Sequence, residues 1–215
     1  AVALATNGLA VVGADIDEDG LAGTAELVEA FDADGTFAGT TTDLTDDGDV
    51  EAVVEAAADE GDLRFVANIA GMQHIASIPE FPMDKYDLLL DIMLRSPFKM
   101  AQAAIPHIED TDDGVGAIAN MSSVHGHYAT KDKPAYITAK HGITGLTRAI
   151  AAEGAGRVRS FSVSVGYVLT PLLVDQIEDT ARARGIPKPD VIEDGLPGPA
   201  RATAMVTPPA AANRF

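Results

Sequence analysis

The sequence predicts an α/β protein in which a parallel sheet carries helices on both of its faces. Strand-like apolar runs alternate with amphipathic helical stretches along almost the whole chain, and this order is typical of βαβ units. The 215 residues are enough to bury the core of one such domain, and neither an internal repeat nor a low-complexity tract divides them. We therefore expect a single domain over residues 1–215.

The expected strands are the short apolar runs of the chain. They lie at residues 9–14, 36–42, 63–69, 115–121 and 158–165. The expected helices are the longer amphipathic stretches between and after these runs. They lie at residues 18–31, 46–60, 83–108, 135–148 and 171–184. Pro134 begins the fourth helix. Proline is favoured at this position because the first N–H groups of a helix have no intrahelical acceptor, and proline has no N–H. Residues 1–7 look like the end of a helix, and the Pro/Gly-rich residues 185–199 are expected to form a loop.

The charge balance is strongly acidic. Asp and Glu number 33 against 15 Lys and Arg, which gives a net charge of −18. Such a surface repels phosphates, so nucleic acid is excluded as a partner. A disordered acidic chain is one interpretation, but 47% hydrophobic residues in regular patterns argue against it. We favour the other interpretation, the surface of a halophile's cytoplasmic protein, whose carboxylates are screened by salt.

Composition also excludes several classes of site and location. There is no cysteine, so disulfides and thiolate metal sites are excluded, and we expect no metal site. No stretch of eighteen or more apolar residues predicts a membrane span, and no signal peptide is evident. We expect a cytoplasmic protein without membrane contacts.

Tyr136 and Lys140 carry the chemistry that the sequence predicts. Residues four apart on a helix share one face, so the phenol and the ammonium should meet the same cleft. A free phenol has a pKa near ~10, and a nearby cation favours its ionised form, which is a base. A Tyr-x-x-x-Lys string also arises by chance on solvated helices. Ser123, which ends the preceding apolar run, makes the chance explanation weaker.

With these residues in this order, the chain resembles the short-chain dehydrogenase/reductase family, in which Ser123, Tyr136 and Lys140 would be the catalytic residues. The strings Asn-Ile-Ala-Gly at residues 68–71 and Gly-Tyr-Val-Leu-Thr-Pro at residues 166–171 match two further marks of the family. The resemblance implies a Rossmann-type doubly wound fold, hydride transfer between NAD and an alcohol, and a homo-oligomer, either dimer or tetramer, in the full-length form.

The resemblance also implies where NAD binds. Asp15 would accept hydrogen bonds from the adenosine ribose and repel the extra phosphate of NADP, although an acidic turn in an acid-rich chain has the same appearance. Tyr136 and Lys140 would hold the nicotinamide ribose. The remaining contacts fall on residues near the ends of other strands, namely Asp43, Leu44, Asn68, Ala70, Gly71, Val168 and Thr170.

A narrower resemblance concerns the substrate. The sequence around Gln73, His125, Lys133 and Gln176 is similar to the D-3-hydroxybutyrate dehydrogenases of the family, where the matching residues hold the substrate carboxylate, beside Ser123 and Tyr136. Charge-assisted donors suit a small acid in an apolar pocket. Taken singly, each of these side chains also fits a solvated surface. Another alcohol, a 3-oxoacyl substrate and a non-catalytic remnant remain as alternatives.

Some family features are missing. No glycine-rich phosphate-binding turn precedes residue 9, and no final strand follows residue 208, so we expect a chain truncated at both ends. Met93 occupies the place of a family asparagine that completes a proton relay, Ile69 that of a second asparagine, and Val165 that of a proline. A thioether cannot hold a relay water in the same way, so slower turnover is expected.

Overall fold

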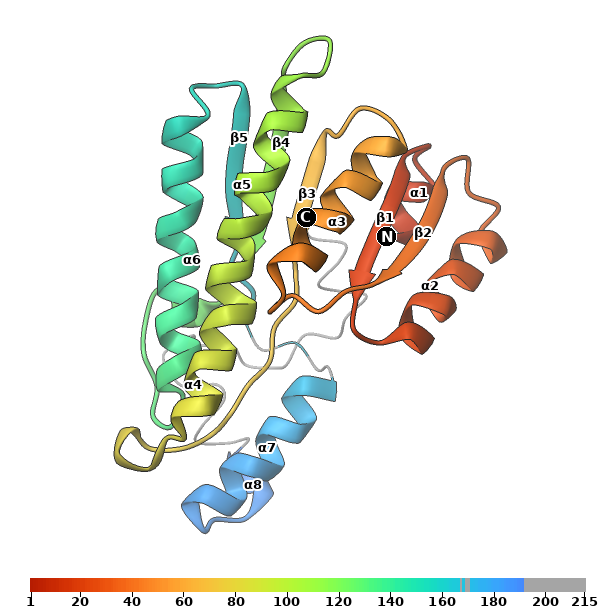
Figure 1. Ribbon diagram of the computed structural model, residues 1–215. Helices are drawn as coiled ribbons and strands as arrows, with labels where there is room; N and C mark the ends of the chain where they lie inside the picture. The colour runs from red at the N-terminus through yellow and green to blue at the C-terminus, as the bar shows by residue number, and fades with distance from the viewer. Residues whose placement is uncertain (167, 169–170, 192–215) are drawn as a thin grey trace.

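A computed structural model describes residues 1–166, 168 and 171–191 of the chain. Its strands form two parallel sheets, shown in Figure 1. β1 (Ala10–Asp15) pairs with β2 (Thr36–Thr41), and β4 (Gly116–Met121) lies between β3 (Phe65–Asn68) and β5 (Val158–Val163). Within the described residues, β1 and β3 are each paired along one edge only.

The helices follow the alternation that the sequence predicts. In chain order they are α1 (Val2–Ala5), α2 (Glu18–Ala30), α3 (Asp47–Asp59), α4 (Met83–Leu90), α5 (Ser96–Glu109), α6 (Pro134–Glu153), α7 (Pro171–Arg184) and α8 (Lys188–Asp190). A π-helical turn, η2 (Asp91–Arg95), joins α4 to α5, and the short 3₁₀ turns η1 (Ile78–Glu80) and η3 (Val124–Gly126) complete the set. None of these helices is both long and apolar enough to cross a membrane.

The predicted fold class is confirmed, with three local differences. α6 continues to Glu153 instead of ending at Arg148, because Ile150 is buried in the core and Gly154 stops the helix against β5. The predicted helix over residues 83–108 is continuous but contains the π-helical turn. The predicted loop after residue 184 begins with the short helix α8, while the rest of that loop lies outside the described residues.

The main core lies where α3, α5 and α6 meet the sheet. It joins Val50 and Val54 of α3, Ala104 and Ile108 of α5, and Ile118 of β4. Figure 1 shows these helices side by side on one face of the strands, with α1 behind the β1–β2 pair. In the described residues β4 is flanked by β3 and β5 and covered by α5 and α6, which explains why it is buried along most of its length.

α7 and α8 form a separate layer beyond the carboxyl ends of the strands (Figure 1). Leu173, Ile177 and Val191 make up their own small core. A salt bridge from Arg184 to Asp132, with 2.8 Å between Nε and Oδ2, ties the end of α7 to the loop before α6. This layer therefore covers the edge of the sheet at which β4 ends and Ser123 follows.

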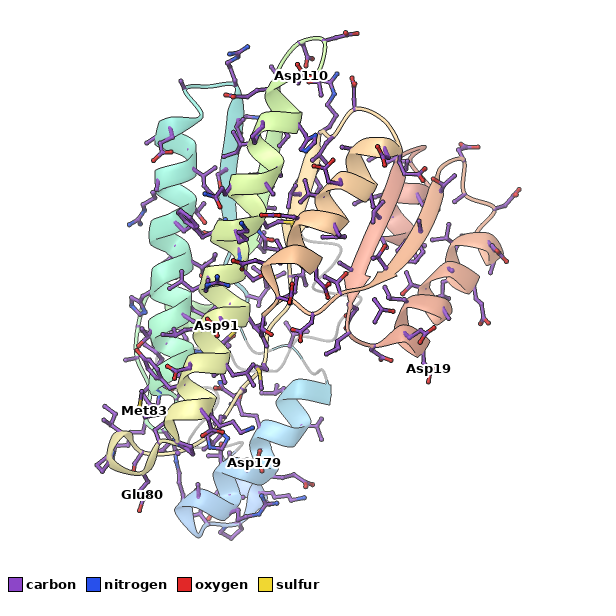
Figure 2. The ribbon with its side chains drawn as sticks, viewed as in Figure 1. Asp19, Glu80, Met83, Asp91, Asp110 and Asp179 are labelled. Atoms are coloured by element: carbon purple, nitrogen blue, oxygen red, sulfur yellow. The ribbon has the colours of Figure 1, made fainter. Side chains whose placement is uncertain are left out.

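The acidic excess is spread over the outer surface. Figure 2 labels exposed carboxylates on different elements, among them Asp19 of α2, Glu80 of η1, Asp110 after α5 and Asp179 of α7. Several acids form ion pairs with Arg or Lys, but with 33 acidic and 15 basic residues most of them have no basic partner available. Self-repulsion across the surface follows.

Candidate active site

Ser123 is held at the carboxyl end of β4 by the turn that follows the strand. Its backbone is extended, and its Oγ accepts a hydrogen bond of 3.2 Å from the backbone N–H of His125. The turn η3 packs closely on α6 at Gly126, where an added Cβ would lie 2.6 Å from Ser122 Oγ and 2.7 Å from the Lys140 carbonyl oxygen. Only glycine allows this approach, so Gly126 fixes the distance between Ser123 and the Tyr/Lys helix.

Tyr136 and Lys140 lie one turn apart on α6, as their spacing predicts. The Lys140 ammonium is 5.5 Å from the centroid of the Tyr136 ring and donates a hydrogen bond of 2.7 Å to the carbonyl oxygen of Met121, at the end of β4. Ser123 lines the same cavity wall as Tyr136, and its hydroxyl acts to lower the pKa of the phenol. Strand end and helix face thus bring the three predicted catalytic residues together.

Burial dominates the electrostatics of the site. It raises the pKa of Tyr136, and the Ser123 hydroxyl opposes that rise. Burial also lowers the pKa of Lys140 to about 8. Burial outweighs the contribution of Ser123, and the lowering of the phenol pKa by Lys140 stays a prediction.

A cavity of about 220 Å³ opens beside these side chains. Most of the predicted site residues at this edge line it, namely Gly71, Gln73, Ser123, His125, Tyr136, Lys140, Val168 and Gln176. Apolar side chains such as Leu173 and Val165 complete the wall. An apolar cavity with a few convergent polar groups is the usual form of a small-molecule site.

His125, which lines the cavity, and Lys133, which lies near it, are both buried, at 3% and 5% exposure. The Nδ1 atom of His125 lies 3.5 Å from Ser123 Oγ, and its Nε2 lies 3.0 Å from Thr130 Oγ1. Burial, with Lys133 and His141 nearby, lowers the pKa of His125 to about 4. Burial, with Arg184 nearby, lowers the pKa of Lys133 to about 8, although Asp132 opposes this. Lys133 does not line the cavity in the part of the chain described here.

The residues predicted to bind the adenosine half of NAD are scattered along the carboxyl edge of the sheet. Asp15 ends β1 and is exposed, and one of its oxygens accepts the Asp17 N–H at 3.1 Å. Asp43 is exposed, and its hydrogen bonds with Thr45 lower its pKa. Leu44 instead packs against the main core. The structure therefore offers polar groups for a ribose along this edge, and the contact predicted for the half-buried Leu44 stays a prediction.

The segment after β3 borders the cavity. Ala70 and Gly71 are exposed, and Asn68 donates a hydrogen bond of 2.9 Å from its Nδ2 to Asn120 Oδ1 on β4. Asn120 in turn donates to Thr147 Oγ1 of α6 at 3.0 Å. This network locks β3, β4 and α6 in register. Thr170, the remaining predicted cofactor residue, lies outside the described residues.

Sequence reasoning missed two polar residues near the site. Thr130 contacts His125, and Asn120 joins Asn68 to α6. Nothing in the local sequence distinguishes Thr130 from other surface threonines, since its contact depends on the path of the loop before α6. Asn120 could have been predicted to form a buried hydrogen bond, because an amide within an apolar strand needs a partner there.

Comparisons with known proteins agree with this arrangement. A family described as Enoyl-(Acyl carrier protein) reductase matches residues 1–187. A crystal structure of a short-chain type dehydrogenase/reductase from Mycobacterium marinum superposes with a TM-score of 0.73 at 26% identity, covering 78% of this chain and 68% of that one. D-beta-hydroxybutyrate dehydrogenase of Rhizobium meliloti is 36% identical over 193 residues, which are 86% of this chain and 74% of the relative. The chain belongs to the short-chain dehydrogenase/reductase family.

This membership makes the chain an oxidoreductase domain with NAD as its cofactor, as expected from the sequence. A second relative, D-beta-hydroxybutyrate dehydrogenase of Cupriavidus necator, is 37% identical over 147 residues, which are 67% of this chain and 56% of that protein. The chain thus spans little more than half of this relative's length.

Proposed function

We propose that this short-chain dehydrogenase/reductase chain interconverts a small 3-hydroxy acid and its ketone, with D-3-hydroxybutyrate and acetoacetate as the favoured pair. The observation that carries the proposal is the cavity in which the Tyr136 phenol meets Ser123 and Lys140, with the amides of Gln73 and Gln176 on the same wall. Two relatives at 36% and 37% identity bear the name D-beta-hydroxybutyrate dehydrogenase, which supports the choice of substrate.

In the proposed mechanism Tyr136 is the base that takes the proton of the substrate hydroxyl. Ser123 holds the reacting oxygen by a hydrogen bond, and the Lys140 ammonium stabilises negative charge on the phenol oxygen as the proton moves. When NAD is bound, it accepts a hydride from the substrate carbon that carries the hydroxyl. A positioned general base typically contributes about 10²–10⁴-fold to the rate.

The residues present fit NAD at the carboxyl edge. Ile69, Ala70 and Gly71 are exposed beside the Tyr/Lys cavity, and the exposed Asp15 lies at the end of β1 on the same edge. We propose that Asp15 binds the adenosine ribose and that Lys140 binds the nicotinamide ribose. The glycine at position 71 leaves the approach to Lys140 open, since even an added Cβ would be 3.9 Å from the ammonium.

The acid group is proposed to meet Gln73, His125 and Gln176 on the cavity wall. The buried Lys133, which lies near His125, is proposed as the charged donor. Burying an ammonium is costly, and burial lowers the pKa of Lys133 to about 8, which still leaves it mostly charged at pH 7. A substrate carboxylate would offset part of that cost by a charge-assisted contact. Such a contact selects acids over neutral alcohols of the same size.

A substrate panel tests the proposal. We expect oxidation of D-3-hydroxybutyrate with NAD, and little oxidation of the L isomer, a 3-hydroxyacyl thioester or a sugar alcohol. Preference for the thioester or for a neutral alcohol would replace the hydroxy-acid assignment by another substrate class. No oxidation of any alcohol in the panel would contradict the enzymatic proposal.

The variant Lys133→Met tests the recognition of the carboxylate. A contact of about 1.5–3 kcal/mol predicts a KM for the acid that is raised roughly 10–150-fold, with a much smaller change for the neutral methyl ester. The matched control is Lys131→Met, since Lys131 is an exposed neighbour in the same loop. Equal penalties for acid and ester would make Lys133 a structural residue.

A further inference from the structure

Three of the side chains proposed to bind the acid group come from segments that are far apart in the sequence. Gln73 lies in the segment after β3, Lys133 directly precedes α6, and Gln176 is on α7. None of these three residues lies in a strand, so the pairing of the sheets does not place them. A residue that holds the three segments together would act on the substrate through these side chains, so the inference rests on the proposed function.

Asp132 lies where the three segments meet. Its carbonyl oxygen accepts a hydrogen bond of 3.0 Å from the backbone N–H of Ala76, three residues after Gln73. Its carboxylate forms a salt bridge with Arg184 at the end of α7, with 2.8 Å between Oδ2 and Nε. Lys133 is the next residue along the chain. Asp132 therefore contacts two of the segments and belongs to the third.

The salt bridge of Asp132 differs from the others in its exposure to water. Among the ion pairs of the described residues, its carboxylate is the least exposed, at 19%, whereas the other carboxylates are 45% or more exposed. Solvated ion pairs contribute little, because water competes for both charges. The shielded pair between Asp132 and Arg184 is better suited to fix the position of α7.

The backbone of Asp132 adopts a conformation that side chains disfavour. Its φ is 68°, in the left-handed region, where Cβ is crowded by the backbone. Asp is one of the few residues besides Gly that enter this region readily. Such a conformation persists where surrounding contacts hold it, and it is frequent at ligand-binding sites. The contacts with Ala76 and Arg184 are of this kind.

Both members of the ion pair are also close to the buried ammonium of Lys133. Burial lowers the pKa of Lys133, Arg184 lowers it further, and Asp132 raises it. On α7, Arg184 comes eight residues after Gln176, which is about 12 Å along a helix. A rigid helix of this length passes a restraint at its end on to the glutamine that lines the cavity.

We propose that Asp132 is a positioning residue that holds the three acid-binding segments in one arrangement. Its carbonyl oxygen holds the segment of Gln73, and its carboxylate holds α7 with Gln176. A direct effect of its charge would have the opposite sign, because a carboxylate near the site repels the substrate anion. The change in KM on removing this carboxylate therefore separates positioning from simple electrostatics.

The variant Asp132→Gly removes the carboxylate and keeps a residue that adopts positive φ freely. We expect KM for D-3-hydroxybutyrate to rise about 10-fold, with kcat changed by less than about 2-fold, because the acid-binding side chains are no longer held in place. KM for the methyl ester and the Kd of NAD should stay the same. A KM for the acid that is unchanged or lower would overturn the proposal.

The matched control is Asp32→Gly. Asp32 also has a positive φ, of 47°, and is exposed in the turn after α2, so the same change removes the same charge from the same kind of backbone. It should leave KM and kcat unchanged. A rise in KM equal to that of Asp132→Gly would overturn the proposal, because lost charge or added chain flexibility would explain both.

The variant Arg184→Met tests the other member of the ion pair and also serves if Asp132→Gly does not fold. Its control is Arg182→Met, because Arg182 pairs with Asp179 within α7. Arg184→Met should raise KM about as much as Asp132→Gly, and the double variant should raise it no further. Additive increases would overturn the proposal, because the two residues would then act independently.

Hydrogen exchange without substrate separates this proposal from the proposed function. The Ala76 amide should be protected in the wild type and should exchange about 10-fold faster in Arg184→Met, because the ion pair supports the turn that accepts from it. Arg182→Met should exchange like the wild type. Equal exchange in Arg184→Met and the wild type would overturn the role of Asp132. If the wild type oxidises no alcohol, the proposed function fails, while the exchange rates still decide whether Asp132 joins the segments.

Discussion

The two sheets in the described part of the chain differ in whether they contain a strand that is buried over most of its length. β4 lies between two neighbours and is buried over most of its residues, whereas neither β1 nor β2 has a buried residue. The buried sheet carries Ser123, and α6 packed on it carries Tyr136 and Lys140. The exposed sheet carries Asp15, the residue proposed to bind the ribose. The difference teaches that the proton chemistry rests on the better-packed half, and the proposed contact with the adenosine ribose on the open one.

The strongest test of this comparison is a pair of isoleucine truncations. Ile118 in β4 is 0% exposed, and Ile16 after β1 is 72% exposed. Ile118→Ala should lower the free energy of unfolding by about 2–5 kcal/mol, because it removes buried methyl groups and leaves a cavity. Ile16→Ala should change it by less than about 0.5 kcal/mol. Equal losses in urea unfolding would show that the two halves are equally packed.

The buried half should also respond to acid through His125. The pKa of this residue is about 4 in the folded protein and 6.5 in the reference state, so between these values the unfolded chain binds a proton that the folded chain does not. The free energy of unfolding therefore falls as the pH falls from 6.5 to 4. Relative to His125→Gln, the wild type should lose about 2–3 kcal/mol between pH 7 and pH 4. Parallel pH curves for the two proteins would show that His125 is not buried in a neutral form.

The acidic surface predicts a smaller and more general effect of salt. The Debye length falls from about 10 Å at 0.1 M to about 3 Å at 1 M, which weakens the repulsion that accompanies a net charge of −18. The melting temperature should therefore rise in molar KCl. The halophilic, cytoplasmic origin expected from the sequence stays a prediction, and an unchanged melting temperature in 2 M KCl would remove its physical basis. The homo-oligomeric state stays a prediction as well.

The sequence predicted the fold because alternating apolar runs and amphipathic stretches depend only on local periodicity. It also placed Ser123, Tyr136 and Lys140 together, since one ends a strand and the others share a helix face. Ile150 shows the limit of this reasoning, because the continuation of α6 depends on burial against β5.

Thr130 shows the same limit within the candidate site. The loop that brings this threonine to His125 takes its path from the close packing of Gly126 on α6, which no local pattern reveals. Leu44, predicted as a cofactor contact, is partly buried against the core, and its contact with NAD stays a prediction. Residues on regular elements were thus predictable from local patterns, whereas a loop residue such as Gln73 was found only through the family resemblance, and Thr130 was missed.

The most direct test of the account is the turnover of Tyr136→Phe with D-3-hydroxybutyrate and NAD. The matched control is Tyr128→Phe, because the Tyr128 hydroxyl is buried and has no hydrogen-bond partner among the described residues. The account predicts that Tyr136→Phe lowers kcat by about 10²–10⁴-fold with an unchanged melting temperature, since the general base is lost. Tyr128→Phe should turn over like the wild type. A Tyr136→Phe protein that keeps the wild-type kcat would contradict the account, because the proton would then be taken by another group.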